Sequence, residues 1–242
     1  RMLSGECGRE IPKEYLLFGN GASELFLAVV HALKPRNIVI PVPSFYGYEY
    51  VAEAAGSYIK YVYLPEETGF RPGRELLQEL TADTDMLFVA NPNNPTGNFN
   101  PRAAMEKIIR NVECPVIMDE AYMEFAVEEG KMEELSTLDL VNEVDNLLVL
   151  KTFSKAYGLA NLRIGYGVGS AAVMKVLKKV LLPYTVNGIS ILAAELLFSK
   201  PEVLRERVEA VVSGRRYLRE QLEALGFRVL PSATNFLLAL PA

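Results

Sequence analysis

Lys155 and Arg163 stand close together in the stretch KTFSKAYGLANLRIGYG, and both side chains can do chemistry. The stretch follows an apolar run, residues 147–150, that predicts a buried strand. An ε-amine at the end of such a strand has a lowered pKa when it is desolvated or near another cation, and it then forms Schiff bases with carbonyl groups. Arg163, with Thr152 and Ser154, offers the bidentate guanidinium and hydroxyl donors that a phosphate dianion binds. A solvated lysine and a surface arginine remain the alternative for the two residues in isolation.

Two further apolar runs end in polar residues. The sequence NPNNPTG, residues 91–97, has two Asn-Pro steps and a glycine, which predict a rigid turn that can hold the amide of Asn94 in a site. The run PVIMD ends in Asp119, whose carboxylate needs a cationic or hydrogen-bonded partner once it is buried. Capping of the following turn is the alternative role for Asp119. A metal site is less well supported, because no histidine or cysteine is near and Glu120 alternates to the other face.

A glycine-rich turn precedes an apolar helix in FGNGASELFLAVV. The backbone N–H groups of Ala22 and Ser23 lie at the expected helix N-terminus, where the helix dipole favours an anion. An ordinary N-cap is the alternative role for Ser23. A second glycine cluster, GYGVG at residues 165–169, lacks the GxGxxG spacing of a dinucleotide loop. The lone histidine, His31, has no acid or nucleophile near it in the sequence, so a histidine-centred mechanism is poorly supported.

Short apolar runs that alternate with amphipathic segments predict an α/β fold, with three α/β/α layers around a mainly parallel mixed sheet. In such sheets ligands bind outside the carboxyl ends of the strands, where the polar clusters above are expected. Strands are predicted at residues 37–42, 58–64, 85–90, 115–119, 146–151 and 162–169. Helices are predicted at residues 22–33, 46–55, 72–80, 101–111, 171–182, 188–199 and 202–225, followed by two strands around a Pro-Ser turn.

A shift in composition near residue 186 predicts two domains. Residues 1–186 are expected to form a large cofactor-binding domain, and residues 187–242 an interdomain helix and the incomplete start of a smaller α+β domain. The chain begins at Arg1 and ends just after an expected strand. We therefore expect it to be part of a longer protein, truncated at both ends.

Composition narrows the classes of function. The formal charge is −5, with 25 basic against 30 acidic residues, and no basic cluster predicts contact with nucleic acid or a membrane surface. No apolar run reaches the length of a membrane span. Cys7 and Cys114 lack the spacing of metal ligands, and two reduced thiols predict a cytoplasmic location.

The four clusters together supply an imine-forming lysine, an aspartate for a cationic ring nitrogen, a phosphate cradle in two parts, and amide or phenol groups for a ring hydroxyl. Pyridoxal phosphate is the cofactor that needs this set. The ordered motifs GNGASE, PSFYGY, NPNNPTG, DEAY and SKAYGLANLRIGY resemble the fold-type-I aminotransferases. Within them the chain is most similar to the branch of histidinol-phosphate aminotransferase and threonine-phosphate decarboxylase, over essentially its whole length.

The resemblance implies a role for each matched residue. Lys155 holds the cofactor as a Schiff base and then acts as general acid–base, and Asp119 pairs with the protonated ring nitrogen. Asn94 and Tyr122 hydrogen-bond the ring hydroxyl, and Phe45 stacks on the ring unless it is an ordinary core aromatic. The implied phosphate ligands are Ala22, Ser23, Thr152, Ser154 and Arg163.

The resemblance also implies a cytoplasmic homodimer in amino-acid biosynthesis that transfers an amino group between a histidinol-phosphate-like amino acid and 2-oxoglutarate or glutamate. Threonine-phosphate decarboxylation on the same cofactor is the first alternative, and a non-catalytic cofactor-binding fragment is the second. The family's N-terminal arm, the tyrosine that reaches the neighbouring subunit and the C-terminal arginine that grips the substrate carboxylate have no counterpart in this sequence. Asn235, in SATNF, is the one residue expected on the substrate side.

Overall fold

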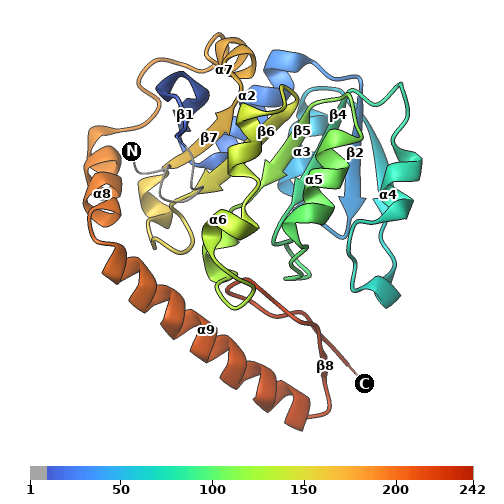
Figure 1. Ribbon diagram of the computed structural model, residues 1–242, viewed down its shortest axis with the longest axis vertical. Helices are drawn as coiled ribbons and strands as arrows, with labels where there is room; N and C mark the ends of the chain where they lie inside the picture. The colour runs from blue at the N-terminus through green and yellow to red at the C-terminus, as the bar shows by residue number, and fades with distance from the viewer. Residues whose placement is uncertain (1–9, 242) are drawn as a thin grey trace.

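The computed structural model describes residues 10–241, and a seven-stranded mixed sheet forms its centre (Figure 1). The strands lie in the order β1-β7-β6-β5-β4-β2-β3. From β3 to β6 neighbouring strands pair in parallel, whereas β7 pairs antiparallel with both β6 and β1. The strands are β1 (Leu16–Gly19), β2 (Asn37–Val42), β3 (Tyr58–Tyr63), β4 (Met86–Ala90), β5 (Val116–Asp119), β6 (Leu147–Thr152) and β7 (Gly165–Gly169). The carboxyl ends of the parallel strands therefore meet at one edge of the sheet.

Helices cover both faces of this sheet. Its α-helices are α2 (Ala22–Leu33), α3 (Gly47–Ala54), α4 (Arg74–Glu79), α5 (Arg102–Arg110), α6 (Met132–Leu135) and α7 (Ala171–Leu177). Short 3₁₀ helices are η1 (Lys13–Tyr15), η2 (Glu66–Thr68), η3 (Met123–Phe125), η4 (Leu138–Asn142) and η5 (Ala160–Leu162).

Alternating strand residues build one hydrophobic core on each face, as the period of two in a β-strand requires. On β6, Leu148 and Leu150 pack with buried residues of α2, α3 and α7. Leu147 and Val149 of the same strand pack with residues of α4, α5 and η4 on the opposite face. The predicted three-layer α/β/α architecture is thus confirmed.

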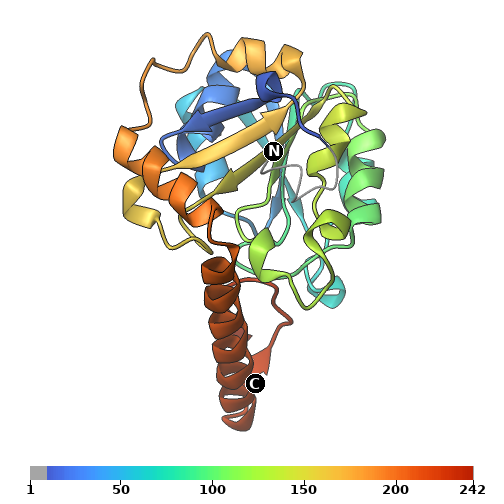
Figure 2. The ribbon, with the colours of Figure 1, turned by 60° about the vertical axis from the view of Figure 1, so that its left-hand side comes forward.

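The elements after residue 187 extend from this body. α8 (Gly188–Phe198) packs at its side, and α9 (Pro201–Ala224) runs outward, with β8 (Arg228–Val229) beside its far end (Figures 1 and 2). β8 pairs antiparallel with β9 (Ala239–Leu240). The division at residue 186 stays a prediction. Among residues 10–241 no helix has the length and apolarity to cross a membrane.

Two predicted elements differ from the observed ones by three or more residues at one end, and one observed strand was not predicted. β7 begins at Gly165 rather than at residue 162, because Arg163 adopts a left-handed conformation with φ 49°. α7 ends at Leu177 instead of residue 182; Pro183 explains only why residue 182 is not helical. The four-residue strand β1 was not predicted, because so short a run carries little periodic signal.

Gly165 allows β7 to pass close to the start of α2. A Cβ at this position would lie 2.5 Å from the backbone nitrogen of Ala22 and 3.0 Å from the carbonyl oxygen of Lys151. We expect Gly165→Ala to lower the free energy of unfolding by about 1–3 kcal/mol in urea denaturation, because backbone must shift to admit the methyl group.

Gly214→Ala is the matched control. Gly214 lies inside α9 with nothing within 4 Å of an added Cβ, so this change should stabilise the protein by about 0.5–1 kcal/mol. An equal response of the two variants would show that the approach of β7 to α2 is not tightly packed.

Candidate active site

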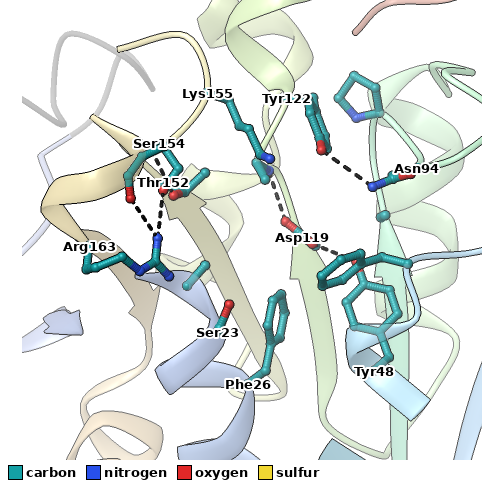
Figure 3. A pocket seen from close by; sticks show the side chains of 16 residues that line it. Ser23, Phe26, Tyr48, Asn94, Asp119, Tyr122, Thr152, Ser154, Lys155 and Arg163 are labelled. Carbon is teal, nitrogen blue, oxygen red and sulfur yellow. Dashed lines mark hydrogen bonds between the residues drawn. The ribbon is translucent and has the colours of Figure 1, made fainter. Parts of the chain in front are cut away.

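A cavity of about 200 Å³ opens where the strand ends converge. The cavity is lined by side chains from five segments, each a loop or helix start next to a strand at this edge (Figure 3). All ten residues predicted to bind a cofactor line this cavity: Ala22, Ser23, Phe45, Asn94, Asp119, Tyr122, Thr152, Ser154, Lys155 and Arg163. The structure brings these residues together, and their individual roles stay predictions.

One end of the cavity is built to hold an anion. The guanidinium of Arg163 donates to the hydroxyl of Ser154 (3.3 Å) and to the carbonyl of Ala160 (3.1 Å). The N-terminus of α2 lies beside it, and its N-cap is Gly21, so Ser23 is the second residue of the helix rather than its cap. The helix dipole and the guanidinium therefore act on the same space, where a phosphate dianion would gain both interactions.

Gly21 makes this close approach possible. It has φ 76°, and a Cβ on it would lie 2.3 Å from Nη2 of Arg163. Only glycine meets both demands without strain. The turn is thus shaped around the guanidinium.

Asp119 lies at the opposite side of the cavity, at the end of β5 (Figure 3). Its carboxylate accepts hydrogen bonds from the hydroxyl of Tyr48 (2.6 Å) and the backbone N–H of Ala121 (3.0 Å). Burial nevertheless raises the pKa of Asp119 to about 6, while those two bonds and the charge of Lys155 act in the lowering direction. A cation that entered the cavity would recover part of this desolvation cost.

Tyr48 also lines the cavity, although the sequence did not predict it as a site residue. Its ring is buried, stacks on Phe88 with centroids 4.9 Å apart and meets Phe26 edge to face. Burial and Asp119 hold the pKa of Tyr48 well above its usual value, so the phenol stays protonated and donates to the carboxylate. The aromatic motif PSFYGY contained it, but no local signal shows that its hydroxyl reaches a strand 71 residues away.

Asn94 and Tyr122 form a polar pair at the cavity wall. The amide of Asn94 donates to the hydroxyl of Tyr122 over 3.4 Å, and the Tyr122 ring meets Phe236 edge to face. Phe45 also lines the cavity, and a Cβ on Gly47 would lie 2.2 Å from its ring. The two polar groups can hold one oxygen of a ligand while the aromatic side chain supplies a flat apolar wall.

Lys155 lies just beyond the end of β6, and the sequence left open whether its side chain is desolvated or solvated. Its side chain is exposed, in the turn that follows β6, and its Nζ lies 5.4 Å from the centre of the Tyr122 ring. The chain has already left the strand at Thr152, so the amine reaches the cavity from its rim. A carbonyl compound can therefore reach Lys155 directly, and a bound ligand would cover it.

Other predicted or rejected candidates lie elsewhere. Asn235 is exposed and does not line the cavity, so the structure gives no support for its substrate-side role. Glu120 points away and accepts hydrogen bonds from the backbone and hydroxyl of Thr137, both at 2.8 Å. Within residues 10–241 no cluster of metal-binding side chains occurs. Cys114 is a free thiol, and Cys7 lies outside the described residues.

The cavity therefore fits a small ligand of defined polarity. Such a ligand has a phosphate toward Arg163 and the start of α2, a cationic nitrogen toward Asp119, and an oxygen toward Asn94 and Tyr122. Its carbonyl carbon would lie within reach of an amine at the rim. This donor set matches pyridoxal phosphate group by group.

Asp119→Asn should reveal the cost of the buried charge. Above pH 6 the buried carboxylate lowers the free energy of unfolding by about 3 kcal/mol, because the pKa of Asp119 is about 6 in the folded protein against 3.8 in the unfolded chain. This loss of stability disappears as the pH falls from 6 to 3.8. The stability of the ligand-free variant relative to the parent should therefore rise by about 3 kcal/mol between pH 3.8 and pH values above 6. Urea denaturation across this range measures the change.

Tyr48→Phe is the companion variant. It removes a hydrogen bond that lowers the pKa of Asp119, so the pH at which the loss of stability levels off should move above 6 in this variant. A stability difference for Asp119→Asn that does not vary with pH would contradict the assignment of the charge cost to Asp119.

The similarity to known proteins extends over nearly the whole chain. The sequence model "Aminotransferase class I and II" matches residues 5–241. A histidinol-phosphate aminotransferase of Clostridium novyi is 33% identical over 232 residues, which are 94% of this chain and 63% of that protein. The chain thus spans less than two thirds of the length of this curated relative.

Two solved structures show the same fold. Histidinol-phosphate aminotransferase from Sinorhizobium meliloti, in complex with pyridoxal-5'-phosphate, has a TM-score of 0.88 at 23% identity, covering 98% of this chain and 63% of that one. L-threonine-O-3-phosphate decarboxylase from Porphyromonas gingivalis has a TM-score of 0.80 at 24% identity, covering 96% and 68%. The family model spans nearly all of the sequence, and the chain belongs to the class I and II aminotransferases.

Proposed function

We propose that this chain is the cofactor-binding part of a pyridoxal-phosphate-dependent aminotransferase. The observation that carries the proposal is the convergence of Lys155, Asp119 and Arg163 on one cavity at the sheet edge. Family membership supports the same reaction class. Pyridoxal phosphate, when bound, supplies an aldehyde carbon for amines and an electron-withdrawing ring that stabilises negative charge at the Cα of an amino acid.

The residues of the chain divide the remaining work. Arg163, Ser154 and the start of α2 bind the phosphate, and Asp119 keeps a proton on the ring nitrogen. Asn94 and Tyr122 orient the ring through its hydroxyl. The amine of Lys155 would hold the aldehyde carbon and would move a proton at the Cα of a bound amino acid.

Transamination is the better supported of the two reactions considered. Curated relatives at 33–35% identity are named histidinol-phosphate aminotransferases, whereas the decarboxylase likeness, at 24% identity, concerns the fold alone. We propose an amino acid with a phosphate-bearing side chain as donor and 2-oxoglutarate as acceptor. The cavity retains the residues of a working site, which disfavours a non-catalytic fragment. The homodimer and the cytoplasmic location stay predictions.

Absorbance spectroscopy tests the proposal. Addition of pyridoxal phosphate to the purified protein should produce a visible band, and L-glutamate or histidinol phosphate should bleach it because the amino group passes to the cofactor. Lys155→Ala should lose the band and the transfer of amino groups. Lys178→Ala changes an exposed lysine after α7 and should behave as the parent.

Other outcomes are equally informative. Release of carbon dioxide from threonine phosphate, with no bleaching by glutamate, would favour the decarboxylase. A visible band of equal strength in Lys155→Ala and the parent would contradict the assigned role of Lys155.

A further inference from the structure

A second lysine of the same segment is buried in an ion pair. Nζ of Lys151 lies 3.0 Å from Oε1 of Glu124, and the two side chains are 1% and 5% exposed. Sδ of Met132 lies 4.0 Å from the amine. Lys151 shares its face of β6 with Val149, which belongs to a hydrophobic core. The pair thus places two full charges in apolar surroundings.

The pair joins the two segments that carry the predicted catalytic residues. Lys151 is four residues before Lys155, and Glu124 lies in η3, two residues after Tyr122. The pairing of β5 with β6 ends at Asp119 and Leu150, with one further backbone bond from Glu120 N–H to the Leu150 carbonyl (2.9 Å). Beyond this point the two segments diverge, and the ion pair connects them there.

A short-range hydrogen bond in each segment links the neighbourhood of the ion pair to the residue that the segment carries. In the first, the N–H of Phe125 donates to the carbonyl of Tyr122 over 3.0 Å. In the second, the N–H of Ser154 donates to the Thr152 hydroxyl over 3.1 Å. A shift at the pair would therefore move Tyr122 relative to Lys155.

Stability does not explain this pair well. The free-energy cost of removing two charges from water offsets much of the gain from their attraction. Apolar residues of similar volume therefore often replace a buried ion pair without loss of stability. A directional contact, by contrast, fixes one relative position of the segments, which an apolar contact between flexible side chains does less well.

We propose that Lys151 and Glu124 are positioning residues that hold the amine of Lys155 at a fixed place relative to Tyr122 and Asp119. This inference rests on the proposed function for its catalytic meaning. The pair touches neither ligand nor reacting atoms; neither residue lines the cavity.

The double variant Lys151→Met with Glu124→Met tests the proposal, because it removes both charges of the pair together. Lys151→Arg keeps the charge pair and is the matched control. The probes are pyridoxal phosphate, whose aldehyde needs Lys155, and pyridoxine phosphate, an alcohol that binds through ring and phosphate only. We expect the double variant to form the visible band about 100-fold more slowly, as for misplaced reacting groups, with pyridoxine phosphate affinity and unfolding midpoint close to those of the parent.

Unchanged band formation in a folded double variant would overturn the proposal, as would an equal loss of affinity for both probes. Amine acylation of the ligand-free protein, mapped by mass spectrometry, gives a readout without cofactor. The reactivity of Lys155 relative to Lys178 should change in the double variant and stay parental in Lys151→Arg; equal ratios in all three proteins would overturn the proposal. Failure of the parent itself to bind either probe would count against the proposed function, and the acylation ratio would still decide on the pair.

Discussion

Parallel pairing of the central strands is the constraint on which the site depends. Because β2, β4, β5 and β6 run in one direction, the chain leaves each of them at the same edge. Phe45, Asn94, Asp119 and Lys155 follow or end these strands and therefore meet in one cavity although up to 110 residues separate them (155 − 45). β7 runs in the opposite direction, so Arg163, which precedes it, reaches the same edge. The fold converts positions after strands into a single site.

The charged side chains near this edge differ in burial and in their partners, and these differences suit the roles proposed for them. Asp119 is buried with neutral donors around it, and its raised pKa shows that the protein carries a desolvation cost there. Lys155 stays exposed at the rim, where an incoming carbonyl group can reach it. Lys151 and Glu124 form a buried ion pair. The carboxylate proposed to bind a cation and the amine proposed as nucleophile both line the cavity, whereas the ion pair does not.

Local signals in the sequence predicted most of the framework. The bounds of α2 and β2 agree with the prediction because a glycine-rich turn and a β-branched run mark them. The residues of the cavity could be predicted because each follows or ends a strand, and the structure brings them together.

Long-range contacts could not be predicted. The bond from Tyr48 to Asp119 and the pair of Lys151 with Glu124 join residues far apart in the chain, and nothing near either partner marks them. The sequence left the exposure of Lys155 open for a related reason: the strand ends at Thr152, and the turn that follows sets the direction of the side chain. Burial in the middle of an element follows from its pattern, whereas burial just past its end depends on the neighbouring segments.

The central claim is that this cavity holds a carbonyl cofactor through Lys155. Reduction of the protein with borohydride in the presence of pyridoxal phosphate, followed by peptide mapping, tests it most directly because reduction makes the bond to the amine permanent. We expect the added mass at Lys155, and its loss when excess inorganic phosphate competes for the cradle around Arg163. Labelling spread over surface lysines, with Lys155 unmodified, would contradict it.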